Sequence, residues 1–464
     1  MKVKYIKNMF LALALAAFLY ILIALIPYMG RVYVSEETRN AFSMENFFGQ
    51  YESSERVLLL ETPSDAFFHR VNLISKAQED ILLSSFAIHE GIAGDIIVGA
   101  LLSAADRGVD IAVIHNVVGG IFPSRYRNVL TAHENIEIYR FNRWEFFRPQ
   151  YLNTALHDKY MVVDGQYMIL GGRNISDRYF DPEGFSGNLS YDREVLVFNT
   201  DREFAGSIAD VTKYFNLKIE SDRSCLRDRR RSNMEAQKNN YIALYLTYKE
   251  GLASGSFDYY ANTVGVNRIT LITNPIDSTK NDSIVAYNLM MMTRNSDVII
   301  AQSPYVVFTR RNFATFVETI QDRDVTLVTN SLASAVNIPA FSGYYVSRRR
   351  LVNAGITIYE FQGVNVSLHG KTYLFDHRLT AIGSFNMNER SIRSDTESML
   401  IIDSEEFHDI VLDAINNQVA QSLRVANDAS YMFCDHVEAA KYSFGKRMLY
   451  TIAGRMLRPF WFMF

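Results

Sequence analysis

This chain of 464 residues has little cysteine and no large excess of charge of one sign. Its two cysteines, Cys225 and Cys434, lie far apart and form no metal-binding motif, which excludes a disulfide-rich scaffold and a cysteine zinc site. A disulfide between them cannot be inferred from sequence, and we expect two unpaired thiols. The net charge of -4 gives no electrostatic case for nucleic acid. Its 48% of hydrophobic and 21% of charged residues indicate a folded protein, and its length predicts two to three well-packed domains.

Long apolar runs are also scarce, and a single one is suited to a membrane. It extends from Met9 to Met29 and follows three lysines, Lys2, Lys4 and Lys7. A cleaved signal peptide has a shorter apolar region that ends in small residues, and this run does not. We therefore expect an uncleaved membrane anchor over residues 1–31. The lysines place the N-terminus in the cytoplasm and the rest of the chain across the membrane, although Arg31 and Arg39 weaken that bias.

Beyond the anchor, the sequence predicts two α/β halves of similar layout. Apolar strands alternate with helices in each half, which implies a parallel or mostly parallel sheet covered on both faces. We expect a connector over 32–60, a first half over 61–220 and a second half over 266–430. An arginine-rich linker and a connecting helix occupy 221–265, and a basic amphipathic segment occupies 431–464.

A histidine motif occurs once in each half with the same internal spacing. In the first half the motif consists of His157, Lys159, Asp164, Gly171 and Asn174. In the second half the same offsets of two, seven, fourteen and seventeen residues separate His369 from Lys371, Asp376, Gly383 and Asn386. One such match is a weak signal, but two with equal offsets indicate that the halves are related by duplication.

The similarity extends past the motifs, with a difference in length. Glu397 lies 203 residues after Glu194, and Phe407 lies 203 residues after Phe204, whereas the two histidines are 212 residues apart. We therefore expect nine extra residues in the first copy, in the loop 178–190 that runs from Arg178 to Ser190.

Two basic segments each leave two interpretations open. The linker from Ser221 to Asn233 is either a solvated connection or a patch for anionic lipid head groups. Its arginines are Arg223, Arg227, Arg229, Arg230 and Arg231. The segment from Lys441 to Phe464 is too charged to span a bilayer. Its apolar face lies either in a membrane interface or against the core of the protein.

The residue types of the twin motif suit chemistry on a phosphate ester. Histidine titrates near neutral pH, so one histidine can attack phosphorus while the other protonates the leaving alcohol. The two lysines supply positive charge for the phosphate, and the two asparagines supply neutral hydrogen-bond donors. The lysines would replace a metal ion. Glu194 and Glu397 can accept a hydrogen bond from the second nitrogen of each imidazole and hold its tautomer.

At these residues the chain resembles the phospholipase D superfamily, over roughly residues 60–425. The strings LHDKYMVVDGQYMILGGRNISDRYF and LHGKTYLFDHRLTAIGSFNMNERS are similar to its bacterial cardiolipin synthase branch, particularly the C type. The resemblance implies an α/β fold of two homologous α/β/α sandwich halves that form one active site. It also implies a phosphohistidine intermediate, formed without a metal or another cofactor, and it favours His157 over His369 as the nucleophile.

The resemblance further implies a role for each remaining motif residue. The phosphate would be held by Lys159, Lys371, Asn174 and Asn386. The histidines would be oriented by Glu194 and Glu397, and the turns would be formed by Asp164 and Asp376. The expected location is a bacterial inner membrane, with a single N-terminal anchor and the catalytic region outside the cytoplasm.

The leading hypothesis is transfer of a phosphatidyl group between phospholipids, which makes cardiolipin from phosphatidylglycerol and a second phospholipid. The anchor and the C-terminal segment favour a lipid substrate and a membrane partner. The alternative is a phospholipase D, in which water replaces the acceptor alcohol and phosphatidic acid is released. The acidic balance and the anchor argue against a nuclease, and no nucleic acid partner is expected. The complete motifs argue against an inactive lipid-binding protein, and the oligomeric state is left open.

Overall fold

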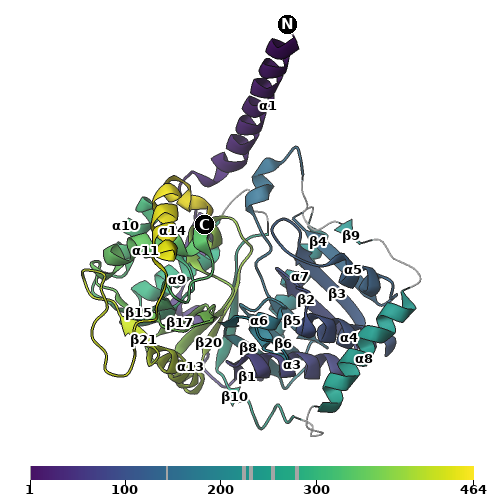
Figure 1. The fold of residues 1–464 in the computed structure, drawn as a ribbon. Helices are drawn as coiled ribbons and strands as arrows, with labels where there is room; N and C mark the ends of the chain where they lie inside the picture. The colour runs from purple at the N-terminus through teal and green to yellow at the C-terminus, as the bar shows by residue number, and fades with distance from the viewer. Residues whose placement is uncertain (1, 143–144, 222–225, 229–233, 252–256, 277–281) are drawn as a thin grey trace.

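A computed structural model of the chain describes residues 2–142, 145–221, 226–228, 234–251, 257–276 and 282–464. Figure 1 shows two α/β halves side by side, with helix α1 (Lys2–Leu25) projecting from one end of the molecule. Each half is built on one large sheet, and equivalent strands follow one another in the same order in both sheets. This repetition confirms the two related halves that the twin motif predicted.

Within the described residues, the first sheet has nine strands in the order β10-β1-β8-β6-β5-β2-β3-β4-β9. They are β1 (Glu55–Leu60), β2 (Asp80–Ser85), β3 (Asp110–Asn116), β4 (Ile136–Phe141), β5 (Tyr160–Val163), β6 (Tyr167–Gly171), β8 (Glu194–Asn199), β9 (Leu226–Arg227) and β10 (Val264–Gly265). The second sheet has eight, in the order β11-β20-β18-β17-β12-β14-β15-β21. They are β11 (Arg268–Thr273), β12 (Val298–Gln302), β14 (Asp324–Asn330), β15 (Thr357–Phe361), β17 (Thr372–Phe375), β18 (Leu379–Gly383), β20 (Ser398–Asp403) and β21 (Ser422–Arg424).

Both sheets are mixed, so the prediction of a mostly parallel sheet was wrong. The parallel pairs are β2–β3 and β3–β4 in the first sheet and β12–β14 and β14–β15 in the second. The other pairs described within the two sheets are antiparallel. The physical reason is that each motif forms a hairpin, β5–β6 and β17–β18, and a short turn joins only antiparallel strands. Asp164 and Asp376 make these turns with φ of 52° and 54°.

Helices cover the outer face of each sheet, and two more helices lie between the sheets. The first outer face packs against α3 (Pro63–Lys76), α4 (Ile92–Asp106), α5 (Ser124–Thr131) and α8 (Glu235–Gly251). The second packs against α9 (Ile284–Arg294), α10 (Arg310–Thr319) and α11 (Ile338–Val352). The inner helices α7 (Ser207–Glu220) and α13 (Glu405–Val419) share one apolar core with both sheets. Because this core crosses between the halves, it holds them as one body.

The first sheet begins earlier than the sequence predicted, inside the expected connector 32–60. Strand β1 pairs with β8 along its whole length. The sequence did not indicate this strand, because the strand begins with a charged residue, Glu55. In the structure Glu55 is buried and caps α7. The carboxylate accepts hydrogen bonds from Ser207 Oγ at 2.7 Å and from Ile208 N at 3.4 Å. The rest of that connector includes the short helix α2 (Glu36–Ala41).

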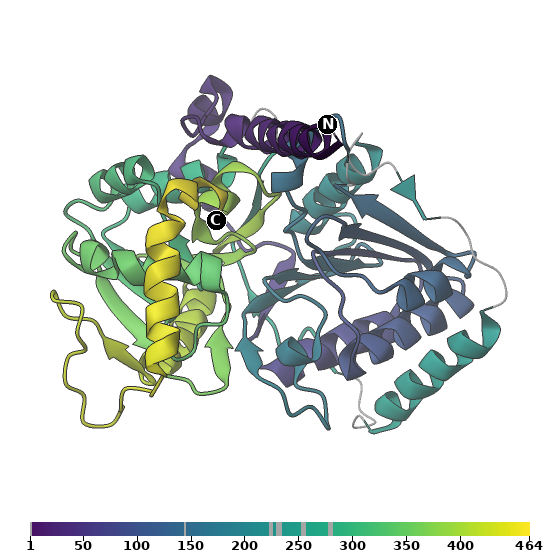
Figure 2. The same cartoon turned by 45° about the horizontal axis from the view of Figure 1, so that its top comes forward.

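Helix α1 is long and apolar enough to cross a membrane. The span Tyr5–Tyr28 has a mean hydropathy of 2.9, and most of its side chains are exposed. The chain that leaves α1 is fastened to the second half, because Arg393 Nη1 donates to Tyr28 O at 3.2 Å and to Gly30 O at 2.9 Å. This contact places the second half next to the end of α1, as Figures 1 and 2 both show.

In the C-terminal helix α14 (Phe444–Met456), docking against the core is confirmed for one face, and a membrane interface stays a prediction for another. One face docks on α11 through buried Tyr450 and through Gly454, where a Cβ would lie 2.4 Å from Ser342 O. Another face is exposed and apolar, and it carries Phe444, Met448, Leu449, Ile452 and Met456. In Figure 1 this helix lies at the end of the second half from which α1 rises.

Most of the arginine-rich linker lies outside the described residues, including Arg223, Arg229, Arg230 and Arg231, as does Cys225. Of this linker, residues 226 and 227 form β9 at the edge of the first sheet. The following helix α8 packs against α4 and belongs to the first half.

Candidate active site

His369 is positioned at the interface by a pair of strands from opposite halves. It follows β16 (Val366–Leu368), which pairs in parallel with β7 (Leu189–Tyr191) of the first half. His369 Nδ1 lies 2.5 Å from Oδ2 of Asp192, the residue after β7. The other oxygen of this buried carboxylate accepts a hydrogen bond from Arg193 N at 2.8 Å. A carboxylate of the first half therefore orients the histidine of the second.

His157 is held in the same way from the opposite direction. The preceding residue, Leu156, forms a β-bridge with Thr396 of the second half, and Glu397 is next in the chain. His157 Nδ1 lies 3.1 Å from both carboxylate oxygens of Glu397, which also accepts a hydrogen bond from Ser384 Oγ. Because both histidines use Nδ1 in this way, Nε2 of each is the nitrogen that no carboxylate contacts, and it can react with a substrate. Nε2 of His369 also lies 3.3 Å from Lys371 Nζ.

Glu194 is not placed where the sequence predicted, and this is a correction. Its fully buried carboxylate pairs with Arg70 at 2.7 Å and with Arg173 at 3.2 Å, instead of with a histidine. Asp192 is the carboxylate that contacts the second-half histidine. Gly172 makes room for it, since a Cβ there would lie 2.5 Å from Asp192 Oδ1.

The strand register explains this error. In the first sheet Leu170 pairs with Val195, and in the second sheet the equivalent Ile382 pairs with Leu400. Strands β8 and β20 are therefore related by 205 residues, not by 203, and the first copy holds seven extra residues instead of nine. A shift of two residues leaves every side chain on the same face of its sheet, so the apolar pattern of the sequence is compatible with either register.

On the observed register, Asp192 corresponds to Glu397, and Glu194 corresponds to Met399. Met399 is fully buried and uncharged, so the second half has no carboxylate at this position. Sequence reasoning also missed Ser384, although it lies in the Gly-Ser-Phe-Asn turn of the second motif. A signal for Asp192 was present as the first acid in Asp-Arg-Glu, but only the register separates these two acids.

The histidines of the two motifs are accessible, whereas the lysines are buried. The side chains of His157 and His369 keep 16% and 12% of their surface exposed, whereas Lys159 and Lys371 are 2% and 0% exposed. Each lysine Nζ donates to the backbone carbonyl of the histidine in its own motif. Lys371 Nζ also lies 2.9 Å from Nδ1 of its histidine. A substrate at the surface of this site would meet the imidazoles first.

The lysines carry less positive charge than usual in the free protein. Burial lowers the pKa of Lys159 to about 7 and that of Lys371 to about 8. The charges of Glu397 and Asp192 act in the opposite direction on both lysines. A bound phosphate would favour the charged form of both lysines, so the site gains positive charge when an anion binds.

Burial also favours the neutral form of both imidazoles. It holds the pKa of His157 well below its usual value and lowers that of His369 to about 3, and the lysines of both motifs act in the same direction. Burial raises the pKa of Glu397 to about 8. Burial would also raise the pKa of Asp192, but the charges of its lysine and histidine neighbours lower it to about 2. Neutral imidazole is the nucleophilic form. The lysine of each motif also lowers the pKa of the histidine in the other motif, so the two motifs are close enough to interact electrostatically.

Asn174 and Asn386 follow the glycine turns at the ends of β6 and β18. The amide oxygens of both are buried and make no hydrogen bond within the described part of the chain. Buried polar atoms without a partner are uncommon in native structures, because their lost hydration is not replaced. Two such atoms at matching positions are consistent with a site that hydrogen-bonds to a ligand.

Asp164 and Asp376 lie at the far ends of β5 and β17 from the histidines. Asp164 accepts hydrogen bonds from the backbone N–H groups of residues 78, 79 and 80, at 2.8 to 3.1 Å. Asp376 accepts two, from residues 297 and 298, at 2.8 and 3.1 Å. Each carboxylate thus joins its hairpin to the start of the neighbouring strand, and we expect a structural role.

Replacing Asp164 with alanine is expected to lower the free energy of unfolding by about 3 kcal/mol, because three backbone donors lose a charged acceptor. The activity of each folded molecule should persist. Urea unfolding, with activity normalised to folded protein, measures both. Asp322→Ala is a matched control, since Asp322 also has a positive φ, of 61°, but is exposed. Equal destabilisation by both substitutions would mean that backbone strain, and not hydrogen bonding, causes the loss.

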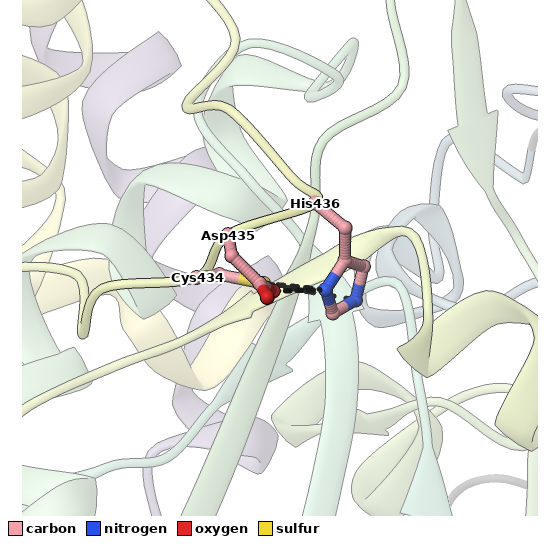
Figure 3. Close-up of side chains that lie close together, drawn as sticks. All are labelled: Cys434, Asp435 and His436. Atoms are coloured by element: carbon pink, nitrogen blue, oxygen red, sulfur yellow. Dashed lines mark hydrogen bonds and ion pairs between the residues drawn. The ribbon is translucent and has the colours of Figure 1, made fainter.

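Two groups of described side chains lie close enough together to hold a metal ion. One combines His157 with Asp395 and Glu397, but Asp395 is paired with Arg390 at 2.8 Å and Glu397 with the histidine. The other group lies on a largely exposed C-terminal loop and consists of three consecutive residues, Cys434, Asp435 and His436 (Figure 3). Adjacent residues meet through chain proximity alone, so we assign no function to this group.

Known proteins include relatives of similar sequence and a solved structure of the same fold. Cardiolipin synthase C of Escherichia coli K12 is 27% identical over 395 residues, which cover 76% of this chain and 82% of that protein. An uncharacterized protein of Helicobacter pylori 26695 is 27% identical over 421 residues, 79% of each chain. The crystal structure of phosphatidylserine synthase from Haemophilus influenzae has the same fold, with a TM-score of 0.64 at 12% identity, over 92% of this chain and 100% of that one.

A family model described as cardiolipin synthase, phospholipase D-like domain, matches residues 71–216 and 289–419. These two segments make up more than half of the chain, and each contains one of the histidine motifs. The chain therefore belongs to the cardiolipin synthase family of phospholipase D-like enzymes.

Proposed function

We propose that this protein transfers a phosphatidyl group from one phospholipid to a hydroxyl of phosphatidylglycerol and so makes cardiolipin. The observation that carries the proposal is the pair of histidines at the interface, each held through Nδ1 by a carboxylate of the opposite half. Two oriented imidazoles suit a transfer in two steps. The relative named cardiolipin synthase C and the membrane-type helix α1 support a phospholipid substrate.

In the first step, Nε2 of His157 attacks the phosphorus, and the bond from phosphorus to the head-group oxygen breaks. His369 acts here as an imidazolium, charged beside the bound anionic phosphate with Asp192 at its Nδ1 proton; it gives its Nε2 proton to the departing alcohol, and a phosphatidyl group remains on His157. In the second step, the hydroxyl of phosphatidylglycerol gives its proton to His369 while its oxygen attacks phosphorus and the P–N bond breaks. Lys159, Lys371, Asn174 and Asn386 would hold the phosphate oxygens throughout.

A lipid-product assay tests this function. Full-length protein in detergent is incubated with phosphatidylglycerol, with and without phosphatidylethanolamine, and products are followed by mass spectrometry. We expect cardiolipin from the wild-type protein and from His377→Ala, an exposed histidine in the β17–β18 turn, and none from His157→Ala or His369→Ala. The lipid requirement identifies the donor. Phosphatidic acid without cardiolipin would show a phospholipase D instead.

The rate of transfer is expected to fall as the pH rises from 7 to 9. Lysine is charged below its pKa, so the positive charge at the phosphate site is lost as the pH passes about 7 for Lys159 and about 8 for Lys371. We expect kcat/KM to fall by about tenfold or more over this range, because this ratio reports the free enzyme. A kcat/KM that stays constant up to pH 9 would contradict a role for lysine charge.

We also propose a bacterial inner membrane location, with the N-terminus in the cytoplasm, the catalytic region outside it, and α14 in the membrane interface. A polarity-sensitive dye on Ile452→Cys, in protein reconstituted in vesicles with both native cysteines replaced, should shift its emission to the blue. The same dye on Thr247→Cys should not shift, because this exposed position lies on α8, far from α1 in Figure 1. Equal spectra at both positions would contradict interfacial burial.

A further inference from the structure

A cavity of about 300 Å³ lies in the second half, between helices α9 and α10 and the sheet. Its wall is mainly apolar and includes Leu289, Met290, Ile299, Phe316, Val325 and Ile392. Residues 31, 32 and 34, from the chain that leaves α1, complete the lining.

The size and lining of this cavity favour an apolar ligand. Protein interiors are close-packed, and voids larger than a water molecule are few. Ligand sites typically have volumes of about 300–1,000 Å³ and mainly apolar walls. Apolar cavities offer water no hydrogen bonds, whereas a hydrocarbon group would bury its surface there.

One wall of the cavity is formed by the turn that carries Asn386. Both chain neighbours of this asparagine, Phe385 and Met387, line the cavity. Tyr373, two residues after Lys371, lines it too, and its Oη donates to Phe385 O at 3.2 Å. The cavity and the proposed phosphate site therefore share one turn and one strand.

Another wall is formed by the chain that emerges from α1. Arg31 and Val32 follow the candidate membrane span within a few residues. The hydrogen bonds from Arg393 to Tyr28 O and Gly30 O hold this segment on the second half. In a protein anchored by α1, this wall would lie beside the bilayer surface, where the available hydrocarbon is the acyl chain of a lipid.

The charged residues of the lining are two exposed arginines, Arg31 and Arg311. Within the described part of the chain, neither forms an ion pair. Their positive charge beside the cavity suits the anionic lipid surface from which an acyl chain would enter.

We propose that the cavity binds one acyl chain of the substrate phospholipid, which enters from the bilayer side while its phosphate lies at the histidines. The identity of this lipid as a substrate rests on the proposed function, whereas the binding of its chain does not. The cavity would select lipids that have a long acyl chain and position them for transfer.

Photolabelling tests this site directly. Full-length protein in nanodiscs is exposed to phosphatidylglycerol that carries a diazirine on one acyl chain, and the labelled peptides are identified by mass spectrometry. We expect labels in α9 and α10. Ala286→Phe and Thr315→Phe place a ring in the lining, and each should reduce this labelling about tenfold, the loss expected when the cavity excludes about two methylene groups. Ala314→Phe is the matched control, since Ala314 lies on the same helix but outside this cavity.

Unfolding transitions of all three variants show whether they fold, and a diazirine fatty acid is the second probe. Labels in α1 alone, or labelling that neither filled variant reduces, would overturn the proposal. Labelling by the fatty acid but not by the phospholipid would overturn it as well.

Transfer is measured in parallel. Histidine-dependent cardiolipin synthesis without labels in α9 or α10 refutes the cavity site alone, and cavity labelling without any transfer supports the site while refuting the proposed function.

Discussion

Replacing His157 with alanine is expected to abolish phosphatidyl transfer and the covalent intermediate together. The loss of a nucleophile should reduce turnover by at least about 10⁴-fold, since no other group can form the bond to phosphorus. His369→Ala should reduce turnover with natural lipids by a similar factor, because it removes both the acid for the leaving alcohol and the base for the attacking alcohol.

A substrate with a good leaving group separates the two roles. Phosphatidyl-p-nitrophenol releases p-nitrophenolate without the help of an acid. With this substrate, His369→Ala should give a burst of one equivalent of p-nitrophenolate and then stall, with a phosphatidyl group detectable on His157 by mass spectrometry. His157→Ala should give no burst. The opposite pattern would assign the nucleophile to His369 and contradict the expectation from the sequence, although a site with two histidines would remain.

Replacing Asp192 with asparagine is expected to reduce kcat by about 10²- to 10⁴-fold with little change in stability. Asparagine keeps the shape of the side chain but removes the charge that holds the Nδ1 proton of His369, so the imidazole can adopt the wrong tautomer. Loss of the equivalent carboxylate in a Ser-His-Asp triad has an effect of about 10⁴. Steady-state kinetics and thermal unfolding on the same samples test this.

Glu194→Gln is the matched comparison for Asp192→Asn, two residues away and equally buried. It should lower the free energy of unfolding by about 3–5 kcal/mol, because Arg70 and Arg173 would lose their buried charge partner. The folded fraction should keep its kcat. If Glu194→Gln removed activity without loss of stability and Asp192→Asn had no effect, the assignment of Asp192 would be wrong.

Much of the candidate site could be predicted from the sequence, because its signals are local. The spacing from His157 to Asn174 reflects one hairpin and one turn, and it recurs from His369 to Asn386 at a constant offset of 212 residues. Glu397 was also predicted as a partner for a histidine, and the structure places it 3.1 Å from His157. These residues have the same relation to one another in any fold that contains the two hairpins.

The sequence by itself determined the duplication, the two histidine motifs with their turns, the membrane-type helix and the kind of chemistry. Only the tertiary structure decided between Asp192 and Glu194, because a shift of two residues preserves the apolar face of a strand. It also decided the mixed sheets, the capping role of Glu55 and the docking of one face of helix α14 on α11. The cavity likewise depends on the tertiary structure, since its lining extends from Arg31 to Ile392 along the chain. Spacing determines what lies within one hairpin, whereas contacts between distant segments depend on how the strands and helices pack.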